Sequence, residues 1–187
     1  MSKLFTACAI AFAFVFAAIT TSTVAAAKEN LVLEINAGGS TQKVVIRLRP
    51  DLAPKHVERA KKLASEGFYD GIVFHRVIPG FMAQTGDPTG TGRGGSKYPD
   101  LPAEFTNAPF KRGTVGAART ANPNSANSQF FICFGDGCSH LAGQYTVWGE
   151  VVSGMDAVDE IKAGEGRGGL VASPDRIEKA YIEQAAS

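Results

Sequence analysis

Eight short runs rich in β-branched and aromatic residues recur along this 187-residue chain, and glycine, proline, asparagine or aspartate separates each run from the next. Runs of this length and composition predict β-strands, so most of the folded part is expected to be sheet. The predicted strands are 31–36, 43–48, 72–77, 81–85, 113–118, 129–134, 145–152 and 176–182.

Two stretches between the predicted strands have helical spacing. Residues 54–66 begin with proline, carry apolar residues three or four positions apart and stop at a glycine. Residues 155–162 place Met155, Val158 and Ile161 three positions apart. Together these elements predict a mainly β domain, a closed eight-stranded antiparallel barrel capped by two α-helices. The pattern alone equally permits a β-sandwich.

The first 27 residues have the three parts of a secretory signal peptide. A basic start at Lys3 precedes an uncharged apolar run, 4–19, and three alanines then offer the small residues that a signal peptidase recognises. A transmembrane anchor is the alternative, but the run is shorter than the ~20 residues that span a bilayer. We therefore expect cleavage after Ala27, a single domain over residues 28–187, and a periplasmic or secreted location.

Charge gives no sign of a nucleic-acid partner. The whole chain carries a formal net charge of +1, and removal of the signal peptide takes away Lys3 and leaves zero. Basic residues on the predicted helix 54–66 are interleaved with Glu58 and Glu66, which indicates a solvated helix face. The remaining chain is long enough for one sizeable core, and without an oligomer signal a monomer is expected.

Two cysteines follow the predicted signal peptide. Cys133 lies within the apolar strand 129–134, which is typical of a buried thiol, whereas Cys138 lies in a polar segment. An exported protein can join such a pair, but the bond also requires a narrow range of Cα separations. The sequence leaves both the disulfide and the free thiols open.

Histidines, serines and glycines offer no familiar hydrolytic, metal or nucleotide site. His56 is expected to face solvent on the first helix, and His75 is expected in the interior as a hydrogen-bonded core residue. No two histidines have metal-ligand spacing, and no serine has the context of a nucleophile. The glycine-rich stretch 86–102 lacks the lysine and the following helix of a phosphate-binding loop, so it is interpreted as a surface loop beside the site. Neither a metal nor a cofactor is expected.

Two segments, 74–87 and 124–132, carry the candidate chemistry. Between them they place one arginine, Arg76, and several amide side chains among bulky apolar residues. Such a set builds an apolar pocket with a single cation and suits a reaction that breaks no covalent bond. An arginine inside the strand 72–77 is costly to bury without a partner, which favours a position facing a groove.

The two segments resemble the signature of the cyclophilins, a family of peptidyl-prolyl cis–trans isomerases, and the resemblance extends from Leu31 to Ile182. It favours the barrel over the sandwich. It implies an enzyme that accelerates X–Pro isomerisation in exported proteins and thereby assists their folding. The implied partners are proline-containing segments of unfolded or folding proteins, with no nucleic acid, no stable membrane association and no cofactor.

The same resemblance assigns roles to individual residues. Arg76 is implied as the catalytic residue, and Phe81 and Met82 are implied to line the proline pocket. Gln84 is implied to order both the substrate backbone and the arginine. The further implied substrate-binding residues are Thr120, Ala121, Gln129, Phe131, His140, Leu141 and Tyr145. For the apolar members of this set, plain core packing is the alternative interpretation.

Three positions depart from the best-known eukaryotic pattern and look like bacterial cyclophilins. His140 stands in place of a tryptophan, and Tyr145 stands in place of a histidine at the pocket rim. Thr120, which follows Arg119, stands in place of an asparagine. A non-catalytic proline-peptide-binding chaperone module of the same fold is the alternative function, and the intact Arg76 favours the enzyme.

Overall fold

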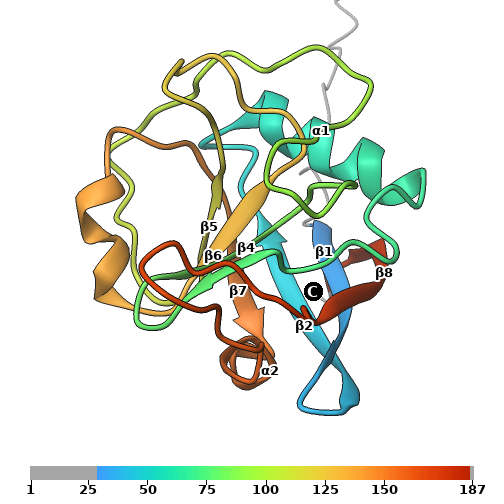
Figure 1. The fold of residues 1–187 in the computed structure, drawn as a ribbon. Helices are drawn as coiled ribbons and strands as arrows, with labels where there is room; N and C mark the ends of the chain where they lie inside the picture. Colours follow the sequence, from blue (N-terminus) through green and yellow to red (C-terminus); the bar gives the residue numbers. More distant parts are fainter. Residues whose placement is uncertain (1–28, 186–187) are drawn as a thin grey trace, which may run out of the picture.

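A single curled antiparallel sheet forms the body of the molecule (Figure 1). The computed structural model describes residues 29–185, and the predicted signal peptide lies outside them. The strand order in the sheet is β3-β4-β6-β5-β7-β2-β1-β8. The strands are β1 (Glu29–Ala37), β2 (Ser40–Leu48), β3 (Arg76–Ile78), β4 (Met82–Thr85), β5 (Thr114–Ala117), β6 (Phe130–Cys133), β7 (Val147–Ser153) and β8 (Arg176–Gln184).

The two ends of the strand order meet where the segment before β3 approaches the start of β8. Gly71 N–H donates to the Ile177 carbonyl at 2.7 Å, Ile177 N–H donates to Ile72 at 2.8 Å, and Phe74 N–H donates to Asp175 at 2.9 Å. These bonds close the barrel over a short seam, so the predicted eight-stranded antiparallel barrel is confirmed with an incomplete last ladder. The strand that was expected over 72–77 is observed only as β3, Arg76–Ile78, because residues 72–75 form this short seam and not a regular ladder.

Helices cover opposite ends of the curled sheet (Figure 1). Helix α1 (Pro54–Ser65) begins with proline and ends before Gly67, whose φ of 67° only glycine adopts freely. Helix α2 (Met155–Asp159) is shorter than predicted. A 3₁₀-helix that the sequence did not predict, η1 (Asp136–Leu141), follows β6.

The expectation that His56 faces solvent is wrong. Its side chain is only 4% exposed, and Nδ1 lies 2.6 Å from the Glu104 carboxylate. The same carboxylate accepts the backbone N–H groups of Lys55 and His56 at the start of α1, so a distant loop covers this face of the helix. Burial lowers the pKa of His56 and favours its neutral form.

Strand β6 separates two hydrophobic clusters. Successive side chains of a strand point to opposite faces, so Phe130 and Ile132 pack in the main core inside the sheet, whereas Phe131 and Cys133 pack on the other face. The second cluster includes Met82 of β4 and is the foundation of the site described below.

No helix among residues 29–185 combines the length and the hydropathy that crossing a membrane requires.

Candidate active site

A row of side chains crosses three neighbouring strands on the face opposite the main core. Arg76 of β3 lies opposite Gln84 of β4, and Gln84 lies opposite Phe131 of β6. The next residue in the row is Gly116 of β5, where a Cβ atom would come within 2.5 Å of the Phe131 ring. The absence of a side chain at Gly116 therefore lets the phenylalanine ring lie flat across the sheet.

A cavity of about 220 Å³ opens above this row. The cavity brings together eight of the residues that the sequence assigned to the site, namely Arg76, Phe81, Met82, Gln84, Phe131, His140, Leu141 and Tyr145. Its remaining lining residues are Ala118 and Arg119, which the sequence assignment missed. Such a small cavity with aromatic walls and one strand-borne cation can hold a compact apolar ring next to a charge.

Two hydrogen bonds fix the Arg76 guanidinium. Nη1 donates to Gln84 Oε1 at 3.1 Å, and Nε donates to the Gly168 carbonyl at 3.0 Å. Within residues 29–185 Nη2 donates no hydrogen bond, so its N–H groups remain available to a bound molecule. The guanidinium is thus held in place while one edge of it stays open, as a group that stabilises developing charge requires.

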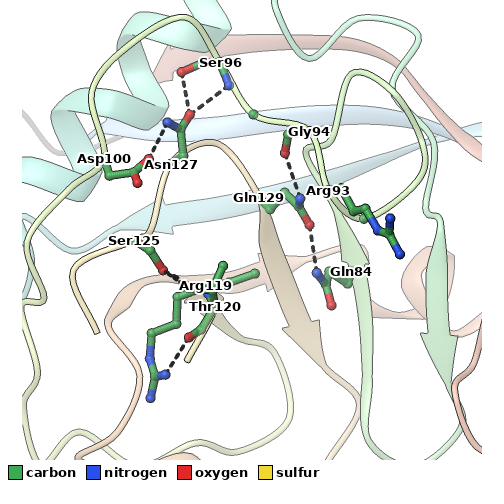
Figure 2. A pocket seen from close by; sticks show the side chains of 13 residues that line it. Gln84, Arg93, Gly94, Ser96, Asp100, Arg119, Thr120, Ser125, Asn127 and Gln129 are labelled. Carbon is green, nitrogen blue, oxygen red and sulfur yellow. Dashed lines mark hydrogen bonds between the residues drawn. The ribbon is translucent and has the colours of Figure 1, made fainter. Parts of the chain in front are cut away.

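The glutamine that holds Arg76 is itself held from the glycine-rich loop. Gln84 Nε2 donates to Gln129 Oε1 at 2.9 Å, and Gln129 Nε2 donates to the Gly94 carbonyl at 2.8 Å (Figure 2). These bonds fix the orientation of both amide groups, which could otherwise flip. The loop therefore lies beside the site, as expected, and supports it.

A buried carboxylate shapes that loop. Asp87 is 1% exposed, and its oxygens accept N–H groups from Thr89 and Gly92 at 2.7 and 2.6 Å. Burial alone would raise the pKa of Asp87, but the hydrogen bonds from Thr89, Gly94 and Gly92 outweigh it and lower the pKa to about 2. Asp87 is therefore ionised at neutral pH and keeps the Gly94 carbonyl in position.

Aromatic contacts build the walls of the cavity. Phe81 stacks on His140 with ring centroids 5.5 Å apart, and Tyr145 meets Phe131 edge to face at 5.8 Å. His140 and Leu141 come from η1, which packs so closely on the turn between β3 and β4 that a Cβ at Gly137 would collide with the Gly80 carbonyl.

A disulfide between Cys133 and Cys138 ties η1 to β6. Their Cα atoms are 6.1 Å apart, within the range that the bond allows. The question that the sequence left open is thereby answered in favour of the disulfide. The wall that carries His140 and Leu141 is consequently anchored to the strand that carries Phe131.

A second cavity of about 510 Å³, lined mainly by polar side chains and glycines (Figure 2), adjoins the first and shares Gln84, Ala118 and Arg119 with it. Thr120 and Gln129, two further residues of the sequence assignment, line this second cavity. Ala121 is exposed and lines neither of the two cavities. Apart from Ala121, the sequence-assigned residues thus line the aromatic-walled cavity or the polar groove beside it, and Gln84 lines both.

His75 points away from Arg76 and is 3% exposed, as the strand alternation predicted. Within the described residues neither ring nitrogen has a hydrogen-bond partner, so the expected hydrogen bond is not made. Burial, and to a lesser degree the neighbouring Arg76, lowers the pKa of His75 and favours the neutral ring. Among residues 29–185 no group of three or more histidine, cysteine, aspartate or glutamate side chains is arranged to hold a metal ion.

Comparison with known proteins identifies this arrangement. The family model for cyclophilin type peptidyl-prolyl cis-trans isomerases matches residues 32–182, nearly all of the described chain. The chain belongs to the cyclophilins. This cyclophilin is an enzyme, a peptidyl-prolyl cis–trans isomerase, as the resemblance of its two motifs implied.

Relatives of this cyclophilin occur in bacteria and eukaryotes. It is 57% identical to a probable peptidyl-prolyl cis-trans isomerase of Brucella suis, over 89% of this chain and 88% of the relative. It is 46% identical to peptidyl-prolyl cis-trans isomerase-like 3 of Rattus norvegicus, over 58% of this chain and 69% of the relative.

Solved structures share the fold. A cyclophilin type isomerase of Cryptosporidium parvum superposes with a TM-score of 0.74 at 26% identity, covering 85% of this chain and 99% of that one. The same protein, solved in the presence of the dipeptide Ala-Pro, superposes with a TM-score of 0.73 at 25% identity, covering 83% of this chain and 99% of that one.

Opening the disulfide of this cyclophilin is expected to lower its stability by about 2 kcal/mol, the chain entropy of a loop of about six residues. Peptide binding should weaken as well, because η1 then loses its covalent anchor on β6. Thermal unfolding and peptide titration with and without a reductant measure both effects. Cys138→Ala is the matched control, since a reductant should change the wild type and leave this variant unaffected. Equal stability of oxidised and fully reduced wild type would contradict the expectation.

Proposed function

We propose that this cyclophilin acts outside the cytoplasm, where it accelerates X–Pro isomerisation in exported proteins and so assists their folding. Arg76 is the catalytic residue of this proposal, and the 220 Å³ cavity is the site that receives the proline ring. The observation that carries the enzymatic part of the proposal is the open edge of the fixed Arg76 guanidinium beside an aromatic-walled cavity of about 220 Å³.

The reaction itself explains why such a site suffices. The barrier to rotation is roughly 18–20 kcal/mol because the amide nitrogen shares its lone pair with the carbonyl. Twisting the bond returns the lone pair to the prolyl nitrogen, so a cation placed there stabilises the twisted state more than either planar one. Neither a nucleophile nor a proton transfer is required.

Each wall of the site has a part in that mechanism. Phe131 forms the floor, and Phe81, Met82 and Leu141 surround the ring, so that the proline is held while the chain before it rotates. Gln84 keeps the arginine in place from below. The groove past Thr120 and Gln129 gives the neighbouring peptide backbone polar partners.

Turnover of a proline peptide, paired with a binding measurement, tests the enzymatic role. We expect catalysed cis–trans exchange, and faster refolding of a protein whose slow phase is limited by an X–Pro bond. Binding of the peptide without faster exchange would instead support the alternative, a module that holds proline segments without turning them over.

Two features support export. The sequence over residues 1–27 has the pattern of a cleavable signal peptide. The Cys133–Cys138 disulfide is of a kind that persists in oxidising compartments and is rare in the cytosol.

The mature protein is expected to begin near Lys28, because the three alanines before it offer small residues at the cleavage positions. Intact mass and amino-terminal sequencing of protein recovered outside the cytoplasm measure this directly. As a control, Ala25 and Ala27 are replaced by bulky residues, which should block cleavage. A stable, membrane-fixed product that keeps residues 1–27 would replace the proposal with an anchored enzyme.

A further inference from the structure

One side chain joins the two rims of the proline pocket. Arg119 follows the end of β5, and its guanidinium reaches a segment 25 residues further along the chain. Nη2 and Nε both donate to the Gln144 carbonyl, at 2.8 and 3.3 Å, and Nη1 donates to the Thr120 carbonyl at 2.9 Å. All three nitrogens are thus engaged with the protein's own backbone.

The same guanidinium lies against the ring at the pocket rim. Its central carbon is 4.3 Å from the centroid of the Tyr145 ring and 5.8 Å from that of Phe105. A planar guanidinium can stack on an aromatic face and donate in its own plane at the same time, which the compact ammonium of lysine cannot do. The tyrosine ring is therefore held between Arg119 and the pocket floor, where it meets Phe131 edge to face.

Both rims are also braced locally. Ser125 Oγ accepts the N–H of Thr120 at 2.9 Å, which braces the residue whose carbonyl Arg119 binds. On the other rim Gln144 and Tyr145 N–H groups donate to the Leu141 carbonyl at 3.0 and 3.1 Å. Because Leu141 is the last residue of η1, a displacement of Gln144 would disturb η1 as well as Tyr145.

We propose that Arg119 is a positioning residue, which clamps Tyr145 in the orientation that closes the proline pocket. It acts through Tyr145 and not on the substrate's charge, because its nitrogens already donate to backbone carbonyls. The proposal rests on the assignment of the 220 Å³ cavity as the proline site. Its consequence is that Arg119 controls how tightly the substrate is held, while the Arg76–Gln84 pair controls how fast it turns over.

The expected signature is a split between binding and turnover. Arg119→Ala should raise KM for a proline peptide about fivefold, since a single cation–aromatic contact is modest in energy. The exchange rate of the bound peptide should stay near the wild-type value, because the bonds of Arg76 are untouched. Arg119→Lys keeps the charge and should still lose most of the affinity. Arg49→Ala, which removes an arginine bonded to Asp51, is the matched control and should change neither quantity.

A double-mutant cycle with Tyr145→Ala decides whether Arg119 acts through the tyrosine. We expect Arg119→Ala to weaken peptide binding in the wild-type background and to have no further effect in the Tyr145→Ala background. Equal losses in both backgrounds, wild-type affinity of Arg119→Ala, or full rescue by Arg119→Lys would each overturn the proposal. If Arg119→Ala does not fold, the Arg119→Lys comparison completes the same cycle. A wild type that neither binds nor isomerises the peptide would refute the proposed function itself. The experiment therefore distinguishes a failure of the proposed function from a failure of the role proposed for Arg119.

Discussion

Arg76→Ala is expected to lower kcat/KM for a proline peptide by about 10²- to 10³-fold, the usual cost of removing one preorganised group that stabilises transition-state charge. The side chain lies on the sheet surface and is fixed by Gln84 and Gly168, so its loss should leave the fold intact. Peptide exchange measured by NMR or by a coupled assay, with thermal unfolding beside it, separates activity from stability.

Two further variants sharpen this expectation. Arg76→Lys keeps the positive charge but cannot donate along two directions in one plane, so only part of the activity should return. Arg112→Ala, which removes an arginine paired with Asp159, controls for the loss of a cation and should keep full activity. Turnover by Arg76→Ala at the wild-type rate would show that another group supplies the catalysis.

Phe131→Ala is expected to cost about 3–5 kcal/mol of stability and to remove most peptide affinity. The ring is 4% exposed, lies over Gly116 and lines the 220 Å³ cavity that we propose as the proline site. Chemical unfolding measures the first effect, and peptide titration of the folded fraction measures the second.

The neighbouring residue provides an unusually close control. Phe130 is 1% exposed, but its side chain packs in the main core on the other face of β6. Phe130→Ala should therefore destabilise the protein by a similar amount while its folded fraction binds peptide normally. If both variants lost affinity equally, general loosening of the barrel would explain the result, and Phe131 would have no separate place in the site.

Most of the strand positions could be predicted from local pattern, because apolar runs bounded by glycine or proline mark strands directly, whereas the choice of a barrel over a sandwich came from the resemblance to cyclophilins. The exceptions depend on contacts between distant segments. Residues 72–75 have strand composition, yet their backbone bonds are divided between the start of β8 and other segments, Tyr69 and Val171 among them, so no ladder forms. The burial of His56 depends on Glu104, 48 residues away. The 3₁₀-helix η1 is too short and too polar to show helical periodicity.

In the candidate site, too, residues in local motifs could be predicted, whereas contacts between distant segments could not. Arg76, Phe81, Met82 and Phe131 could be assigned because they lie in two compact motifs that resemble those of the cyclophilins, and the resemblance also gave Leu141 and Tyr145 outside them. Arg119 could not, since its partners are backbone carbonyls of Gln144 and Thr120, and a carbonyl leaves no trace in the residue types of a sequence. The support that Asp87 gives to the Gly94 carbonyl was equally hidden, because it depends on the conformation of the glycine-rich loop.

The pairing of β1 with β8 also determines where anything attached to the enzyme would project. Glu29 lies opposite Gln184, so the described chain enters and leaves the barrel at one corner. Arg176, at the other end of β8, bridges to Val73 near the site, roughly 25 Å away at the usual rise per strand residue. A short tag joined at either end would therefore attach at the opposite end of β8 from the Val73 bridge. A short linker between the two ends would likewise permit circular permutation of the barrel.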